Sequence, residues 1–218
     1  MISDRRRVTS TTATPGRNSG GSSEAERRVD CGSLAVDSTL RDTSKVAAAI
    51  AGALIVGTFL IALVVEAGFG ANARRWLAFD FAGLPMRPAE AVSVFRHNLG
   101  VLLAVAGLLV IAQTPYWAGE TQPGRSHRLV RGAGEMLLAG AVAANVAVVG
   151  ASFGAYGARM IRAALPHGPL ELCGFCLPLG LYIKGRNQPI PVWLLVVVAA
   201  LSLAGLAIAA LLEVYVTV

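Results

Sequence analysis

The chain alternates between long uncharged apolar runs and short polar segments, and that pattern predicts membrane-spanning helices. Runs rich in Leu, Val and Ala, without any Asp, Glu, Lys or Arg, cover residues 46–65, 98–119, 136–158 and 190–212. A bilayer core about 30 Å thick needs about 20 such residues per helix, because each residue advances a helix by about 1.5 Å. Each of the four runs therefore predicts one span.

A fifth apolar segment, residues 165–183, has a mixed character. Its one formal charge is Glu171, and it contains three prolines, which disfavour a regular helix. Its second half, residues 172–183, is too apolar to leave in water. Without a span here, the loops on either side of it would also be forced onto the same face of the membrane. We therefore expect an all-α, polytopic transmembrane bundle of five spans.

The first 45 residues have the opposite composition. Ser, Thr, Gly and Arg dominate, and few side chains could build a core. Such segments cannot bury enough apolar surface to offset the entropy of ordering the chain. We expect a disordered basic tail at residues 1–45 and a transmembrane helical domain at residues 46–218.

Composition and charge agree with a membrane protein and suggest its orientation. The chain is 55% hydrophobic and 15% charged, with a mean hydropathy of +0.60. Most of its 19 Lys and Arg lie in the tail and in residues 125–131 and 184–186, on one side of a five-span topology. The positive-inside rule then predicts a cytoplasmic amino terminus. The net charge of +6 is explained by basic residues that anchor helix ends to anionic lipid, so no nucleic-acid partner is expected.

Three polar residues stand at the start of two predicted spans. Asn98 begins the second span, while His167 and Glu171 begin the fourth, and both spans start on the same side of the membrane. Residues four apart lie on one face of a helix, so His167 and Glu171 can share a partner. A carboxylate inside a membrane is tolerated when it is neutral, paired or facing a wet cavity. We therefore expect a polar cluster between the helices.

Asn145 lies near the middle of the third predicted span, among Ala and Gly. We expect its amide to bond a neighbouring helix and to join the same polar interior. Gly150 and other small residues nearby permit close approach of a second helix.

The polar residues at the start of the fourth span form a motif. Leu165-Pro166-His167-Gly168 followed by Glu171-Leu172 resembles the PHG-x-x-EL motif of the stage II sporulation protein M family of multi-span bacterial membrane proteins. The segment HNLGVLLAVAGLL at residues 97–109 is similar to a second piece of that family, and Asn145 followed by Gly150 to a third. The resemblance covers about residues 88–212. The chain departs from the family pattern at Leu99, where a second Asn is frequent, and at Val146, where Gly is usual.

The resemblance implies a helical component of a bacterial cell-envelope machine. The sporulation member localises and scaffolds partners that degrade peptidoglycan and has no assigned catalytic activity. By this resemblance we expect a scaffold or assembly component of the bacterial cell membrane, not an enzyme, with no cofactor. Its partners would be the lipid bilayer and other envelope membrane proteins, and a homo-oligomer stays open.

A small transporter is the main alternative. An intramembrane acid beside an interrupted helix is how many carriers bind ions or protons. Five spans, however, do not divide into two equal repeats.

Two further chemistries are less favoured. Cys173 and Cys176 form a C-x-x-C pair that a membrane thiol-disulfide oxidoreductase could use, but such a relay needs a second external pair, and the one remaining cysteine is Cys31 in the tail. A metal site from His97, His167 and Glu171 is not expected, because three ligands on two helices require a coincidence of helix rotation.

Overall fold

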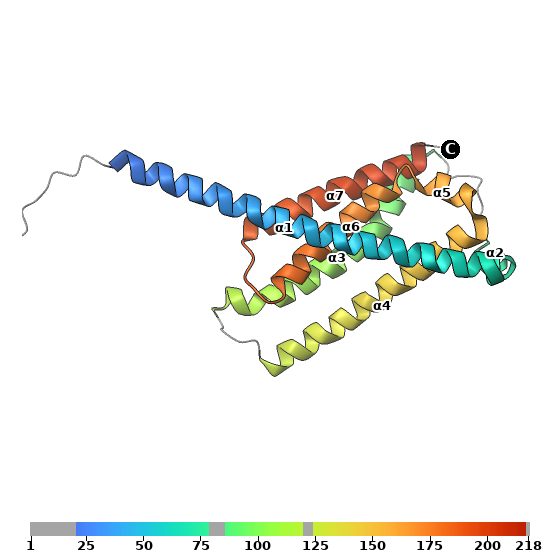
Figure 1. The fold of residues 1–218 in the computed structure, drawn as a ribbon, viewed down its shortest axis with the longest axis horizontal. Coiled ribbons are helices and arrows are strands. Elements are labelled where there is room, and N and C mark those ends of the chain that lie inside the picture. Colours follow the sequence, from blue (N-terminus) through green and yellow to red (C-terminus); the bar gives the residue numbers. More distant parts are fainter. Residues whose placement is uncertain (1–20, 79–85, 120–123, 217–218) are drawn as a thin grey trace, which may run out of the picture. The chain divides into compact units, whose positions relative to one another are not determined.

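The computed structural model describes residues 21–78, 86–119 and 124–216, with side chains from residue 40 onward. The chain divides into two compact units at residue 39, and the fold described below is that of Leu40–Val218. All elements in the described part are helices (Figure 1). In chain order they are α1 (Gly21–Val64), the π-helical η1 (Val65–Phe69), α2 (Gly70–Leu77), α3 (Pro88–Trp117), α4 (Arg125–Tyr156), α5 (Ala158–Ala164), α6 (Gly168–Gly185) and α7 (Val192–Tyr215).

Four helical segments are long and apolar enough to cross a membrane: Leu40–Leu77, Pro88–Trp117, Arg125–Tyr156 and Val192–Tyr215. They confirm the prediction of an all-α, multi-span membrane protein. The second and third helices begin about ten residues before the runs expected at 98–119 and 136–158, because charged first turns continue into the apolar segments.

The fifth predicted span, residues 165–183, corresponds to α6, which begins at Gly168. Helix α6 is not among the candidate spans, so a fifth crossing stays a prediction. Its buried residues are Gly174, Cys176, Pro178, Gly180, Leu181, Tyr182 and Gly185. A helix that faces protein instead of lipid does not need a continuous apolar surface, which accounts for the lower hydropathy of α6.

The amino-terminal boundary differs from the expected one. Residues 1–20 of the predicted disordered tail lie outside the described residues, and α1 begins at Gly21. The helix continues through residues 40–45, which had been assigned to the tail. Thr43 and Ala47 are buried there, and both lie close to Gly180 of α6. The first helix therefore contacts the bundle before Val46.

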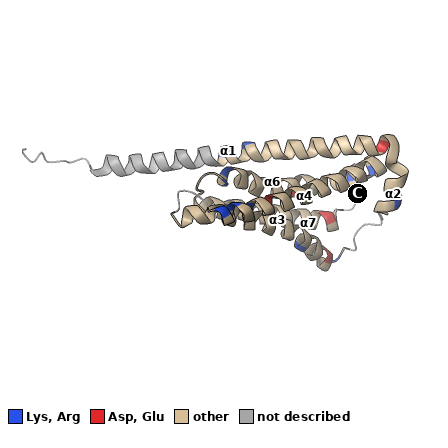
Figure 2. Ribbon diagram, turned by 90° about the horizontal axis from the view of Figure 1, so that it is seen from below, with Lys and Arg blue, Asp and Glu red and all other residues tan. Residues whose placement is uncertain are grey.

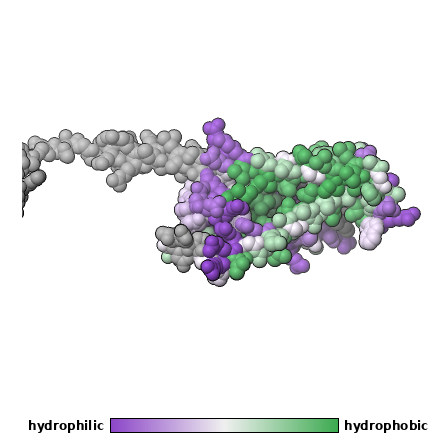
Figure 3. Space-filling view, turned by 60° about the horizontal axis from the view of Figure 1, so that its bottom comes forward, coloured by the Kyte–Doolittle hydropathy of each residue, from purple (hydrophilic) through white to green (hydrophobic). Residues whose placement is uncertain are grey.

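The core lies between α3, α6 and α7, which run side by side in Figure 1. It contains Val105, Leu108, Leu109, Ala112, Leu181, Tyr182, Ile190, Leu194 and Val198. The positions on α3 and α7 recur every three or four residues, as expected for one buried face of a helix. Figure 3 shows hydrophobic residues over the middle of the molecule, as a surface in contact with lipid requires.

Helix α4 packs closely on α1 through Gly150 and Gly154. A Cβ atom added at Gly150 would lie 2.7 Å from the backbone oxygen of Thr58. A Cβ atom added at Gly154 would overlap the backbone oxygen of Ala62. Two glycines four residues apart let helix backbones approach in a membrane, where dispersion contacts drive association.

The bundle has two distinct ends, and Figure 2 shows most of the charged residues near them. At the turn end, α3 and α6 finish and residues 186–191 lead into α7. At the α5 end, α3 and α6 begin and α7 finishes. Each end holds a group of polar side chains.

Candidate functional site

A cavity of about 420 Å³ lies at the α5 end. This polar cavity is lined by Glu90, Ser93, Val94, His97, Asn98, His167, Glu171 and Glu213. The residues come from the first turns of α3, the start of α6 and the last turn of α7. Three segments far apart in the sequence therefore build one polar site.

Helix α3 contributes a stripe of side chains to the polar cavity. Glu90, Ser93 or Val94, and His97 or Asn98 follow one another at spacings of three and four residues, which places them on one face. Pro88 begins the helix, and its fixed φ suits the first helical position. Glu90 consequently lies in the first turn of α3, at the amino-terminal end of the stripe.

Helix α6 supplies His167 and Glu171. His167 is the N-terminal cap residue of α6, and its carbonyl oxygen accepts the backbone N–H of Leu170 at 3.0 Å and that of Glu171 at 3.1 Å. The two side chains are one turn apart, and both face the polar cavity. The carboxylate of Glu171 also lies where the helix dipole favours a negative charge.

Asn98 and Glu171 are joined by a hydrogen bond. Asn98 Nδ2 donates to Glu171 Oε1 at 2.6 Å between partly buried side chains 73 residues apart. The bond ties α3 to α6. The structure thus places Asn98, His167 and Glu171 around one polar cavity.

Glu213 and Glu90 also line the polar cavity, and neither was predicted from the sequence. Glu213 is half-buried near the end of α7, within electrostatic reach of His167, Glu171 and His97. The sequence contains one clue to Glu213, which is that it is the one charged residue after Arg186. Such a residue at a helix end is typical of a solvated terminus, so the sequence alone did not mark it.

The polar cavity carries three carboxylates and two imidazoles, and no Lys or Arg is among its described lining residues. Its electrostatic field attracts cations and basic groups, which bind carboxylates by charge-assisted hydrogen bonds. In the described ranges, no three His, Cys, Asp or Glu side chains are arranged to hold a metal ion. The arrangement suits the binding of a cationic group or the exchange of protons.

Two residues expected in the polar interior lie elsewhere. Asn145 is exposed on α4 and donates to Ala141 O of its own helix at 3.1 Å, and Gly150 packs on α1. Val146, Gly150 and Gly154 face α1, and Asn145 lies about 100° to 180° around the helix from them. The contact with α1 therefore turns Asn145 outward.

The remaining motif residues do not line the polar cavity. Pro166, Gly168 and Leu172 are partly buried, and in the sequence each is next to a residue that lines the polar cavity. Cys173 is exposed, Cys176 is buried, and both are free thiols.

A second polar group lies at the turn end and was not predicted. Gln113 is completely buried on α3. Its Nε2 donates to Gly185 O at 2.5 Å and to Gln188 O at 3.0 Å, and its Oε1 accepts the backbone N–H of Ile190 at 2.8 Å. This Gln113 clamp fixes the turn between α6 and α7.

Next to the clamp, Glu135 of α4 connects to α6 and to the turn. Tyr182 Oη donates to Glu135 Oε1 at 2.6 Å, and Arg131 and Arg186 lie 3.8 and 4.0 Å from the same oxygen. Arg131 also donates to Arg186 O at 3.0 Å. This Glu135 network joins α4 to the α6–α7 turn.

No protein-family model, curated protein or solved structure matches the chain. The fold and its apolar helices establish a multi-span helical membrane protein that contacts the lipid bilayer.

Proposed function

We propose that the chain is an integral membrane scaffold or assembly component of a bacterial cell-envelope complex, as its resemblance to the stage II sporulation protein M family implies. The observation that carries this proposal is the 2.6 Å hydrogen bond between Asn98 and Glu171. The two residues belong to separate pieces of the resemblance, and they are 73 positions apart in the sequence. Their contact supports the reading of those pieces as one structural unit.

The proposed role of the polar cavity is to receive a basic group of a partner protein. Its lining offers Glu90, Glu171 and Glu213 without a competing Lys or Arg in the described part. A Lys or Arg side chain would find anionic hydrogen-bonding partners there. In this proposal the chain has no catalytic activity and needs no cofactor.

The proposed orientation places the polar cavity outside the cytoplasm. With α6 as a fifth span and a cytoplasmic amino terminus, the α5 end faces the exterior, where peptidoglycan is remodelled. The turn end, with Arg131 and Arg186, then faces the cytoplasm, as the positive-inside rule requires.

The test is crosslinking and pull-down of the full chain from native membranes. The wild-type chain should recover specific envelope proteins, including proteins that act on peptidoglycan, and Glu171→Gln should weaken their recovery. Glu66→Gln is the matched control, because Glu66 is an exposed carboxylate of η1 outside the polar cavity. Equal recovery by the two variants would contradict the role of the polar cavity.

A second candidate is a small transporter of protons or cations, favoured by the same carboxylate-rich cavity. Pro178 lies inside α6 and removes one backbone donor from the helix, a feature found where transporter helices line a pathway. In liposomes containing the purified chain, a cation or proton flux abolished by Glu171→Gln would favour transport. Partner recovery without flux would favour the scaffold.

A further inference from the structure

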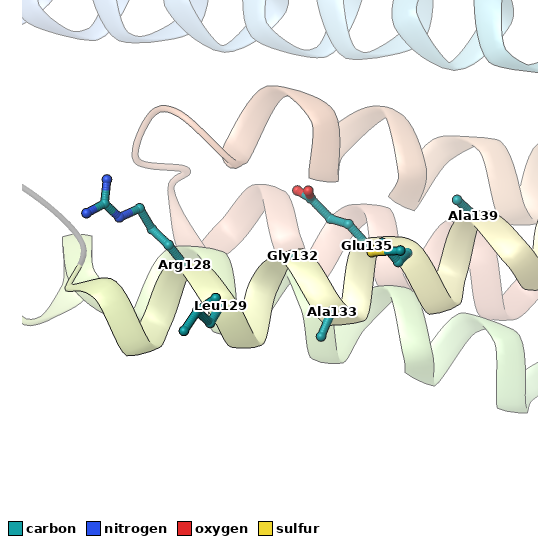
Figure 4. Close-up of a pocket in the computed structure, with 7 residues that line it drawn as sticks. Arg128, Leu129, Gly132, Ala133, Glu135 and Ala139 are labelled. Atoms are coloured by element: carbon teal, nitrogen blue, oxygen red, sulfur yellow. The ribbon is translucent and has the colours of Figure 1, made fainter.

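Helix α4 carries a second hollow, at the turn end and away from the polar cavity. This α4 groove has a volume of about 680 Å³ and is lined by Arg128, Leu129, Gly132, Ala133, Glu135, Met136 and Ala139 (Figure 4). All of these residues belong to one helix.

The shape of the α4 groove follows from helical spacing. Arg128, Gly132, Glu135 and Ala139 follow one another at intervals of four, three and four residues, so they form one stripe. Because Gly132 has no side chain and Ala139 has only a methyl group, the helix surface is recessed at these two positions. A Cβ atom added at Gly132 would meet nothing within 4 Å. Beside the stripe, Leu129 and Met136 are 75% and 78% exposed, which makes the neighbouring wall apolar.

Charge is distributed unevenly along the α4 groove. Arg128 is exposed and has no ion-pair partner within the described ranges, and Arg125, three residues earlier, is exposed at the same end. Glu135 is instead held by Tyr182, Arg131 and Arg186. One end of the groove therefore offers free positive charge. Farther along, the Glu135 carboxylate is already paired within the protein, and the remaining lining residues are small or apolar.

The length of the α4 groove matches one leaflet of a bilayer. From Arg128 to Ala139 the helix advances 11 steps, about 16 Å at about 1.5 Å per residue. Half of a hydrocarbon core about 30 Å thick is about 15 Å. A headgroup at Arg128 would thus leave room for one acyl chain along the groove.

We propose that the α4 groove binds one anionic phospholipid, with its phosphate at Arg128 and an acyl chain over Gly132 and Ala139. The planar guanidinium of Arg128 presents paired N–H donors that match phosphate oxygens. The acyl chain covers apolar surface beside Met136. This site shares no residue with the polar cavity, so a test of lipid binding is independent of the scaffold proposal.

The test measures the lipid that stays with the full chain. The protein is reconstituted in nanodiscs of phosphatidylglycerol and phosphatidylcholine in equal amounts, and retained lipid is counted by native mass spectrometry. Wild type should retain one phosphatidylglycerol in preference to phosphatidylcholine. Arg128→Gln should lower this retention about fivefold, the change expected from losing one basic residue near a membrane surface. Arg75→Gln, an exposed arginine of α2 at the α5 end, should retain it.

A second pair of variants separates a seated lipid from general surface charge. Gly132→Leu fills the α4 groove without changing charge and should also release the lipid. Gly107→Leu is its control, because Gly107 is exposed on α3 and also has nothing within 4 Å of an added Cβ. Retention by Gly132→Leu, equal retention of both lipids by wild type, or a second protein chain bound in place of lipid would overturn the proposal.

Discussion

The two ends of the bundle use polar side chains in opposite ways. At the turn end, the Gln113 clamp and the Glu135 network pair polar groups with one another across α3, α4, α6 and the turn. At the α5 end, Asn98–Glu171 is the one side-chain hydrogen bond found among the described residues of the polar cavity, and the other polar groups face open space.

This difference indicates a division of labour. Buried polar groups that are fully paired specify how helices pack, whereas polar groups left around a cavity are available to a ligand. Substitutions at the turn end should therefore lower the free energy of unfolding. Substitutions at the α5 end should alter binding and leave the fold intact.

The largest effect is expected for Gln113→Leu. The change leaves Gly185 O, Gln188 O and the N–H of Ile190 without their partner, and each lost hydrogen bond costs about 1 kcal/mol. The free energy of unfolding should fall by about 3 kcal/mol, measured by denaturant unfolding in detergent micelles. Thr114→Val, at the exposed neighbouring position, should stay within about 0.5 kcal/mol of wild type. A loss no larger than that of the control would show that the clamp does not hold the turn.

A pair of glycines should reproduce the contrast. A Cβ atom at Gly185 would overlap Ile190 and lie 3.1 Å from Gln113 Nε2, while one at Gly168 would meet nothing within 4 Å. Gly185→Ala should cost about 2 kcal/mol through overpacking, and Gly168→Ala should be nearly neutral. Thermal unfolding of the two variants side by side is the measurement. Equal losses would mean that the α5 end is as crowded as the turn end.

Tyr182→Phe should have a smaller effect. It removes the hydroxyl that donates to Glu135, and a hydrogen bond to a charged group contributes about 1.5 kcal/mol or slightly more. Tyr116→Phe on α3 is the control, because its hydroxyl has no hydrogen bond within the described part of the chain. A double-mutant cycle with Glu135→Gln should show coupling between Tyr182 and Glu135, and additive losses would exclude it.

The smallest effect on stability is expected for Glu171→Gln. Glutamine keeps an oxygen that can accept from Asn98, so the free energy of unfolding should change by less than about 0.5 kcal/mol. The loss of negative charge should still weaken binding of a basic partner, measured by the recovery described above. A loss of stability as large as that of Gln113→Leu would remove the distinction between the two ends.

The sequence was sufficient for the features that depend on length and on local order. Uncharged runs predict four helices because a bilayer sets their minimum length. Asn98, His167 and Glu171 were predictable as a cluster because alternate spans begin on the same side of a membrane. Nothing in that reasoning requires knowledge of helix rotation.

The features that depend on rotation and on long-range pairing were not predictable. Asn145 faces outward because Gly150 and Gly154 orient α4 toward α1. Gln113 lies near the end of an apolar run, where a polar side chain is expected at the membrane–water interface. In the structure it instead binds backbone groups more than 70 positions away in the sequence. Glu213 joins the polar cavity only because α7 ends beside α6.

The close packing of α6 on α7 has a consequence for biogenesis. Helix α6 falls outside the candidate spans, and its buried Gly174 lies against Leu206 and Ser202 of α7. The ribosome synthesises α6 before α7, so α6 leaves the exit tunnel before the helix that covers its buried face exists. The insertion machinery then has to handle the two as a hairpin, and a chain cut short within α7 would present a stranded segment to quality-control proteases.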